Sequence, residues 1–227
     1  MNKRTLVTTL CTVAFFAVLA GTAHAGKAID PNNFGDAIDN PWHPLIPGTV
    51  MTYAGTKDDK PATQVVTVTS KTKTIDGVKC VVVEDVMSLA GAPADRTVGY
   101  FAQDKNGNVW YFGEDVQELD PKGNVTKTEG WHAGIDGATP SIVMEAVPAK
   151  GHTLINAYTN DHAEVVSLAK SVKVPFGSYK EALLMKEWTP DEPDVLTNKY
   201  YVKNIGAVRD VAVKGDREEF LLVDVKH

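Results

Sequence analysis

Cysteine is almost absent from this chain of 227 residues. There are two, Cys11 and Cys80, and Cys11 lies in an N-terminal apolar run that has the features of a removable leader. The mature chain then holds one cysteine, so it has no internal disulfide and depends on its hydrophobic core for stability. Cys80 lies in the sequence VKCVVV, residues 78–83, which is typical of a buried strand. We therefore expect a small, buried, unreactive thiol.

Long hydrophobic runs are also scarce. The run at residues 6–19 is shorter than the ~20 residues that a helix needs to cross a bilayer. Lys3 and Arg4 precede this run and the sequence AHA follows it, ending at Ala25. A cationic start, a short apolar core and a small-x-small end together predict a secretory signal peptide at residues 1–25, cleaved near Ala25. Removing 25 of 227 residues leaves 202, which is enough for one domain.

The leader predicts a periplasmic or secreted protein without stable membrane insertion. A lipid anchor is not expected, because Leu10 precedes Cys11 where a lipoprotein signal needs a small residue. Positively charged residues are fewer than negatively charged ones. The formal net charge is −6, and it becomes −8 when the leader that contains Lys3 and Arg4 is removed. A negative surface argues against nucleic acid and anionic membranes as main partners.

Catalytic and cofactor motifs are missing. The sequence has no G-x-S-x-G, no H-E-x-x-H, no phosphate-binding loop and no G-x-G-x-x-G, so no cofactor is expected. Residues 104–107 (DKNG) resemble the start of a calcium loop. Asp115, however, stands where such a loop needs its final glutamate. A hairpin turn explains this segment better.

What the sequence does contain is period-two alternation with turn residues every 8–12 positions. Residues 26–40 are small and polar and predict an N-terminal arm, and a domain at 41–227 follows. Prolines at positions 41, 44 and 47 exclude a regular helix there, and Trp42 and Leu45 are expected to plug one end of the core. The segments expected to form strands are residues 49–55, 63–75, 78–89, 97–103, 108–116, 125–131, 164–174, 178–188, 196–202, 207–214 and 218–225. Residues 141–147 fit a short strand or one helical turn.

Two of the predicted turns carry most weight. Asp76-Gly77 between two β-branched runs is a strong hairpin signal. A turn at residues 106–107 (NG) places Phe101 opposite Phe112, with large apolar groups on both faces of the ribbon. The sequence therefore predicts a mainly β, single-domain antiparallel meander that forms a curved sheet or open half barrel with little helix.

Three segments resemble motifs of a group of secreted bacterial β-rich proteins. Residues 44–53 (PLIPGTVMTY) resemble their PLxPGTxWxY start, with Met51 where tryptophan is usual. Residues 174–179 (VPFGSY) are similar to their VPxGTF turn, and residues 199–208 (KYYVKNIGAV) to their YYxxGVGLV hairpin. The resemblance spans nearly the whole mature chain and implies a curved sheet similar to lipoprotein-carrier or lipocalin-like half barrels. It implies no catalytic residues.

Two sets of side chains are candidate sites. Aromatic residues in or beside the predicted strands suit a concave pocket, although core packing is the more common role of each. These aromatic residues are Tyr100, Trp110, Tyr111, Trp131, Trp188 and Tyr201. A second set of imidazole and carboxylate groups suits a borderline divalent metal, although their spacing is not that of a tight site. These are His152, Asp161, His162 and Glu164.

Three functions follow, in order of preference. The first is a non-enzymatic exported protein that holds an apolar or amphipathic small molecule in the concave face of its sheet. The second is a cell-envelope protein–protein interaction module without a pocket. The third is a hydrolase in which His132 works with Asp136 or Glu145. The first rests on analogy of fold.

Overall fold

The computed structural model describes residues 29–227, so the predicted leader and its cleavage near Ala25 lie outside the described residues. One antiparallel sheet of 13 strands makes up most of this part of the chain. Its only helical element is a short 3-10 turn, η1 (Pro31–Asn33). Between residues 29 and 227 no helix is long and apolar enough to cross a membrane. The expected mainly β fold with little helix is confirmed.

The strands match the segments expected from alternation, with one addition. Residues 178–188, which contain good helix formers, are a strand, and residues 141–147 contain a strand rather than a helical turn. A short strand at residues 153–156 was not expected. The strands are β1 (Val50–Lys57), β2 (Lys60–Ile75), β3 (Val78–Leu89), β4 (Ala92–Gln103), β5 (Val109–Leu119), β6 (Val125–His132), β7 (Ser141–Met144), β8 (Thr153–Asn156), β9 (Asp161–Val174), β10 (Gly177–Trp188), β11 (Leu196–Val202), β12 (Gly206–Lys214) and β13 (Glu218–Lys226).

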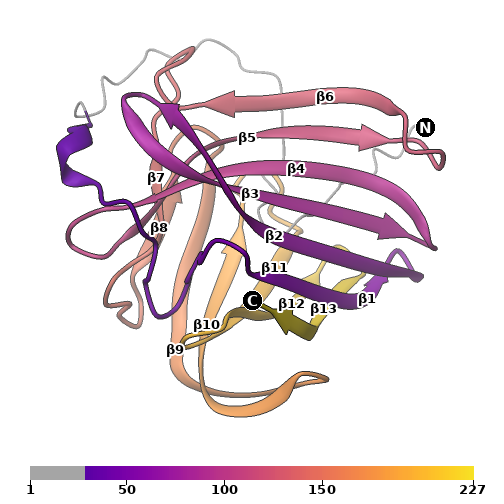
Figure 1. Cartoon of the computed structure of the whole chain (residues 1–227). Coiled ribbons are helices and arrows are strands. Elements are labelled where there is room, and N and C mark those ends of the chain that lie inside the picture. Colours follow the sequence, from indigo (N-terminus) through magenta and orange to yellow (C-terminus); the bar gives the residue numbers. More distant parts are fainter. Residues whose placement is uncertain (1–28) are drawn as a thin grey trace.

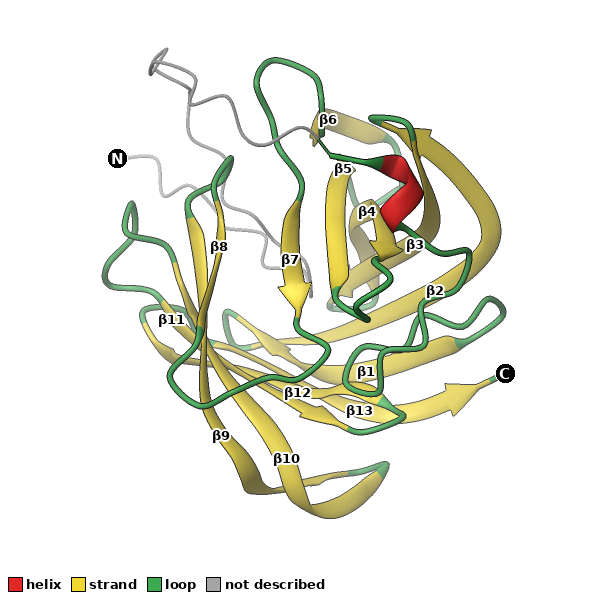
Figure 2. Ribbon diagram, turned by 90° about the vertical axis from the view of Figure 1, so that its left-hand side faces the viewer, coloured by secondary structure: helices red, strands yellow, loops and turns green. Residues whose placement is uncertain are grey.

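The first and last strands pair at the centre of the sheet. Its order is β6-β5-β4-β3-β2-β1-β13-β12-β11-β10-β9-β8, with β7 paired to β5 off this path (Figure 1). Tyr53 of β1 lies opposite Leu222 of β13 in this central pair. Strong curvature turns the sheet into an open trough, with β1, β13 and β12 at its base. The strands from β3 to β6 rise on one side, and β9 and β8 on the other (Figure 2).

Local turn chemistry sets the hairpins. Asp76 (φ 47°) and Gly77 (φ 78°) both adopt the left-handed conformation that a tight two-residue hairpin requires, as their sequence predicted. The loop between β4 and β5 is longer than expected. Asp104 Oδ1 accepts hydrogen bonds from the backbone N–H groups of Asn106 and Asn108, both at 2.9 Å. These bonds fold residues 104–108 into one closed loop.

This longer loop corrects the predicted register of β4 and β5. Gln103 pairs with Val109, and Phe101 therefore lies opposite Tyr111 rather than Phe112. The prediction was wrong by one residue because it placed the turn at residues 106–107 alone. Large apolar groups nevertheless occur on both faces of this ribbon, as expected.

Each face of the sheet carries its own core. The concave core includes Trp42 and Leu45, which are 6% and 3% exposed, so both are buried in the core as expected. The convex face of β3, β4 and β5 carries a smaller core that contains Cys80, Tyr100 and Phe112. Cys80 is fully buried, which confirms the expected environment of the thiol.

The N-terminal arm is attached to the sheet along its described part. Phe34 forms an isolated β-bridge with Asp104 and packs against the convex core. Asn40 holds the end of the arm, because its side-chain amide donates to the carbonyls of Gly107 (2.8 Å) and Glu145 (3.1 Å). The residues that follow the arm include His43, which packs against Phe101 of the concave core.

Candidate functional site

A row of aromatic rings crosses the concave face. His43 contacts Phe101 with ring centroids 5.8 Å apart, and Phe101 stacks on Tyr111 at 4.7 Å. Tyr111 meets Trp131 edge-on at 5.5 Å, and Trp131 meets Tyr158 at 5.3 Å. Because Tyr158 precedes β9 on the opposite wall, these rings connect the two walls of the trough. The walls touch through side chains where the sheet order provides no backbone ladder.

Beyond this row, the concave face becomes polar and acidic. Seven carboxylic acids and two lysines occupy inward-facing strand positions or their ends. The acids are Asp85, Asp95, Glu114, Asp161, Glu187, Asp210 and Glu218, and the lysines are Lys57 and Lys199. All of these side chains except Asp161 and Glu187 are buried, and a buried charge costs free energy unless it is paired.

Each of the two lysines forms ion pairs with carboxylates other than Asp85 and Asp95. Lys57 Nζ lies 2.5 Å from Glu218 Oε2. Lys199 Nζ lies 2.7 Å from Glu187 and 3.5 Å from Asp210. Burial opposes the charge of Lys199, but the two carboxylates outweigh it and hold the pKa of the ammonium well above its usual value.

Asp85 and Asp95 have no such partner. They lie on the neighbouring strands β3 and β4, and neither forms an ion pair with any residue of 29–227. Asp85 Oδ2 accepts a hydrogen bond from the Gln64 amide at 2.7 Å. Asp85 Oδ1, both oxygens of Asp95, Gln64 Oε1 and Thr97 Oγ1 are buried and have no hydrogen-bond partner in this part of the chain. Unsatisfied buried acceptors of this density require an explanation.

The pKa values of these two carboxyls reflect the same situation. Burial raises the pKa of Asp95 to about 7, with Glu118 adding to the effect and Lys57 opposing it. Burial likewise raises the pKa of Asp85 well above its usual value; the Gln64 hydrogen bond opposes this shift and the nearby charge of Asp95 adds to it. A raised pKa favours the neutral form of each carboxyl, which needs no cationic partner.

Glu114 and Asp161 extend the acidic region towards the aromatic row. Burial raises the pKa of Glu114 to about 8, although the Tyr111 hydroxyl (2.8 Å) and the Trp131 indole stabilise its ionised form. Burial raises the pKa of Asp161 to about 6. The charge of Asp161 acts on Glu114 from the other wall, so the two walls of the trough share one electrostatic environment.

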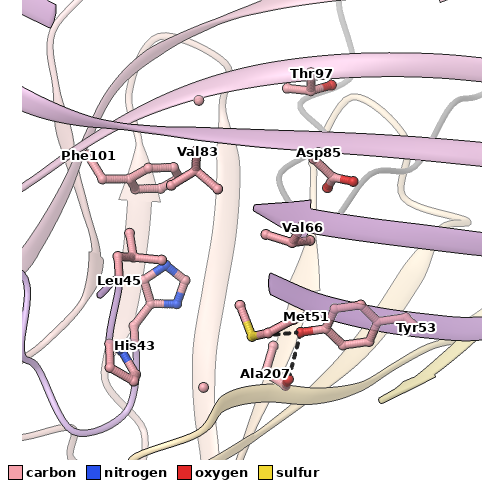
Figure 3. A pocket seen from close by; sticks show the side chains of 13 residues that line it. His43, Leu45, Met51, Tyr53, Val66, Val83, Asp85, Thr97, Phe101 and Ala207 are labelled. Atoms are coloured by element: carbon pink, nitrogen blue, oxygen red, sulfur yellow. Dashed lines mark hydrogen bonds between the residues drawn. The ribbon is translucent and has the colours of Figure 1, made fainter. Parts of the chain in front are cut away.

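A cavity of about 40 Å³ lies where the apolar and acidic halves meet (Figure 3). Asp85 and Thr97 form its polar side, and Leu45, Val66 and Phe101 are among its apolar walls. One water needs ~10–15 Å³ on the same measure, whereas drug-sized ligands occupy ~300–1,000 Å³. The cavity therefore admits a small chemical group without rearrangement.

His43 also borders this cavity, and it brings no positive charge. Its burial, with the nearby Lys199 charge, lowers the pKa of His43 to about 4, so the ring is neutral near pH 7. Its Nε2 atom is buried without a hydrogen-bond partner among residues 29–227. His43 therefore adds a polar atom to a wall that is otherwise apolar.

The structure divides the aromatic candidates between the two faces. Tyr111, Trp131 and Tyr201 belong to the concave core. Tyr100 and Trp110 lie on the convex face, where Tyr100 donates a short hydrogen bond to Asp115 and Trp110 donates to Asp104 at 2.9 Å.

Trp188, the sixth aromatic candidate, packs against His162 with ring centroids 5.2 Å apart. Lys186 lies 4.7 Å above the Trp188 ring. Strand alternation and the pairing of Trp188 with His162 put both on the face opposite Asp161. Three of the six aromatic candidates therefore belong to the concave core, and none of the six lines the cavity beside Asp85.

The four metal candidates are engaged separately. His152 Nδ1 lies 3.3 Å from Glu145, and Glu164 forms an ion pair with Lys186 at 2.6 Å. Asp161 accepts a hydrogen bond from Thr159 at 2.6 Å. Within residues 29–227 no group of three or more His, Cys, Asp or Glu side chains is arranged to hold a metal ion.

The acid–base pair considered for a hydrolase has different partners in the structure. His132 Nε2 lies 3.1 Å from Asp115, whose other oxygen accepts from Tyr100. Glu145 lies beside His152 instead.

Sequence reasoning missed the most unusual residues of the site. Asp85 interrupts an inward-facing series in β3 that is otherwise apolar, with Val83 before it and Met87 after it. The sequence did indicate this residue, because a carboxylate stands where the alternation of β3 predicts an apolar side chain. Gln64 in β2, which lies between the buried Ala62 and Val66, is a second polar side chain at such a position.

Comparisons with known proteins give two solved structures. No family model matches the chain, and no curated protein does. A protein of Bacteroides fragilis that is inferred to be exported and has a YmcC-like fold covers 82% of this chain and 99% of its own, with 16% identity and a TM-score of 0.47. An inferred lipoprotein of Parabacteroides distasonis covers 85% and 100%, with 13% identity and a TM-score of 0.42. At these values the likeness assigns no function, and the resemblance drawn from the three sequence motifs stays a prediction.

Proposed function

We propose that this protein is an exported, non-enzymatic binding protein that holds a small amphipathic molecule at the junction of the apolar and acidic halves of its concave face. One observation supports this above the others. The cavity at this junction has a buried carboxylate with a free acceptor oxygen, Asp85 Oδ1, on one side and apolar walls elsewhere. A few polar groups in an otherwise apolar hollow are typical of ligand sites.

The size of the cavity limits what enters it. At about 40 Å³ it takes the polar group of a ligand and little more. The remainder of the ligand fits only if side chains of the two walls of the trough move apart. Trp131 and Tyr158 are a place where the two walls are in contact. The cavity is therefore much smaller than one that encloses a whole drug-sized ligand.

The interaction-module alternative needs an apolar patch on the outside of the sheet. The exposed large apolar side chains of residues 29–227 come from eight different strands or connections. They are Ile46, Val125, Ile135, Val147, Ile155, Leu168, Phe176 and Val213. No single strand or connection among residues 29–227 contributes more than one of these side chains, so the alternative has less support than binding in the cavity.

Native mass spectrometry of the mature protein, purified from the compartment to which it is exported, tests the proposal. The expected result is a retained small molecule that denaturation releases. Val83→Leu adds volume at the cavity wall without changing polarity, and we expect it to reduce that retention. The exposed Val213→Leu is the matched control. A clean mass for the wild-type protein, together with no binding of small amphipaths in solution, would favour the interaction module.

A further inference from the structure

We propose that the polar group of the ligand is a primary ammonium, bound by the carboxylates of Asp85 and Asp95 together with Gln64 and Thr97. This inference rests on the proposed function and names the chemical class that the site selects. It rests on four side chains of the adjacent strands β2, β3 and β4, which have buried polar atoms without a hydrogen-bond partner among residues 29–227.

The unpartnered atoms at this place are nearly all acceptors. Asp95 and Gln64 are completely buried, and Thr97 and Asp85 are 2% and 6% exposed. Asp85 Oδ1, both carboxylate oxygens of Asp95 and Gln64 Oε1 accept hydrogen bonds, and the Thr97 hydroxyl can either accept or donate. The group that satisfies them must therefore be rich in N–H or O–H donors. An ammonium has three donors and no acceptor, whereas an alcohol has one donor.

Strand register brings these side chains together. Asp85 lies directly opposite Thr97 in the β3–β4 pair, and Asp95 lies opposite Met87, the next inward-facing position of β3. Gln64 faces Met87 from the other side, in the β2–β3 pair. The four polar groups thus surround one position on the concave face, and Asp85 and Thr97 open onto the cavity (Figure 3).

Charge leads to the same conclusion. The charged and titratable groups that act on the Asp85–Asp95 pair are Lys57 of β1, Glu118 of β5 and Lys199 of β11. Each of the two lysines is already held by carboxylates at 2.5–2.7 Å. His43 at the far wall is neutral near pH 7. An anionic group bound here would lie beside two carboxyls, and both nearby lysines already form ion pairs with other carboxylates. Carboxylate and phosphate ligands are therefore disfavoured.

The apolar walls suit the carbon attached to such a group. Leu45, Met51, Val66 and Val83 line the cavity beside Asp85, and the Phe101 ring forms another wall. An ammonium that enters here leaves its first methylene groups against these side chains. The face of an aromatic ring also attracts a cation directly.

The ammonium also changes the protonation of the site. A cation favours the ionised carboxylate, so its binding lowers the raised pKa values of Asp85 and Asp95 and releases protons. Affinity for an ammonium therefore increases as the pH is raised from 5.5 to 7.5. For Asp95, whose pKa is about 7, the increase approaches tenfold per pH unit below that pH.

The test uses three probes of equal length, n-hexylammonium, hexanol and hexanoate, in isothermal titration of the mature wild-type protein at pH 7.5. We expect hexylammonium to bind at least tenfold more tightly than hexanol, and hexanoate to bind least. Asp95→Asn and Asp85→Asn should each weaken hexylammonium binding at least tenfold and leave hexanol binding unchanged. Asp136→Asn, at an exposed acid, is the matched control.

The outcomes separate the two proposals. Equal binding of hexanol and hexylammonium, or tighter binding of hexanoate, overturns the ammonium assignment and leaves a binding protein. No binding of any probe removes the proposed function, and the assignment with it. If a variant does not fold, the comparison of the three probes on the wild-type protein and its pH dependence still decide the question.

Discussion

Tyr111 and Glu114 are three positions apart on β5, yet both face the trough, and the Tyr111 hydroxyl donates to Glu114 Oε2 at 2.8 Å. Strict alternation places residues three apart on opposite faces of a strand. A β-bulge removes this conflict: Tyr100 of β4 pairs with Gly113 and Phe101 pairs with Tyr111, so Phe112 is the extra residue. The bulge thereby brings a carboxylate into the aromatic row.

Gly113 is the residue that permits this bulge, and Gly113→Ala tests it. The backbone of Gly113 has φ 133°, and a Cβ there would lie 2.1 Å from the Trp131 carbonyl oxygen. We expect the substitution to lower the free energy of unfolding by about 2 kcal/mol or more, because both strain and a clash must be relieved. The measurement is denaturant unfolding, together with near-ultraviolet circular dichroism of Trp131.

Gly137→Ala is the matched control for that substitution. Gly137 also has a positive φ, 80°, but no atom lies within 4 Å of its added Cβ. It should cost about 1 kcal/mol, the conformational penalty alone. Equal effects of the two substitutions would mean that the close approach of β5 and β6 contributes nothing.

The second prediction concerns the pH dependence of stability at Asp95. Its pKa is about 7 in the folded protein and 3.8 in an unfolded chain, so the folded state binds the proton more strongly. The contribution of this group is most favourable below pH 4, declines between pH 4 and 7, and stays low above pH 7. A difference of about three pKa units corresponds to roughly 4 kcal/mol. Asp95→Asn removes the titration, so the variant should be more stable than the wild type at pH 8.

Urea unfolding at pH 4, 6 and 8 checks this prediction through the difference between variant and wild type. Asp136→Asn, at an exposed acid, is the matched control. A stability difference for Asp95→Asn that stays constant from pH 4 to 8 would contradict the assignment of the titration to this carboxyl.

The third prediction concerns the buried ion pair of Lys57 and Glu218, whose side chains are 5% and 7% exposed. Lys57→Met leaves a buried carboxylate without its partner and should cost about 3–5 kcal/mol at pH 8. Burial already raises the pKa of Glu218 to about 7, and Lys57 opposes that rise. Without the lysine the carboxyl protonates more readily, so the cost should be smaller at pH 5.

A double variant and an exposed pair complete that experiment. Lys57→Met with Glu218→Leu should recover most of the stability, since no unpaired charge remains. Lys214→Met should have little effect, because the Lys214–Asp194 pair is exposed. The prediction fails if the double variant is as unstable as Lys57→Met.

Most strands and several turns were predictable because their signals are local. The Val- and Thr-rich alternation of β2 and the Asp76-Gly77 turn act between neighbours in sequence. Pairing of β1 with β13 was not predictable, since strands that are distant in sequence carry no local mark of their partner. The register of β4 and β5 depended on the Asp104 side chain, which closes a loop longer than its Asn-Gly pair suggests.

The candidate site was predictable only in part. Three of the six aromatic residues that the sequence indicated lie on the concave face. Which face each aromatic residue of β4 and β5 takes depends on the bulge beside Gly113, and no sequence pattern indicates that bulge. Asp85 was visible as a charge in an apolar series. That Asp85 lacks a cation while Lys199 already has Glu187 depends on distances between strands that no sequence pattern specifies.

The last prediction concerns Cys80. Burial raises the pKa of its thiol to about 12, and its Sγ contacts the Val78 carbonyl oxygen at 3.6 Å. Because the thiolate is the reactive species, an aromatic disulfide reagent at pH 8 should label the native protein at least a thousandfold more slowly than the unfolded protein, which has a thiol of ordinary pKa. Labelling in increasing urea should follow the global unfolding transition, since the convex core that covers Cys80 must open first. Cys80→Ala, which has no thiol, shows that the signal comes from this residue, and fast stoichiometric labelling without urea would mean that this core opens independently of the rest of the sheet.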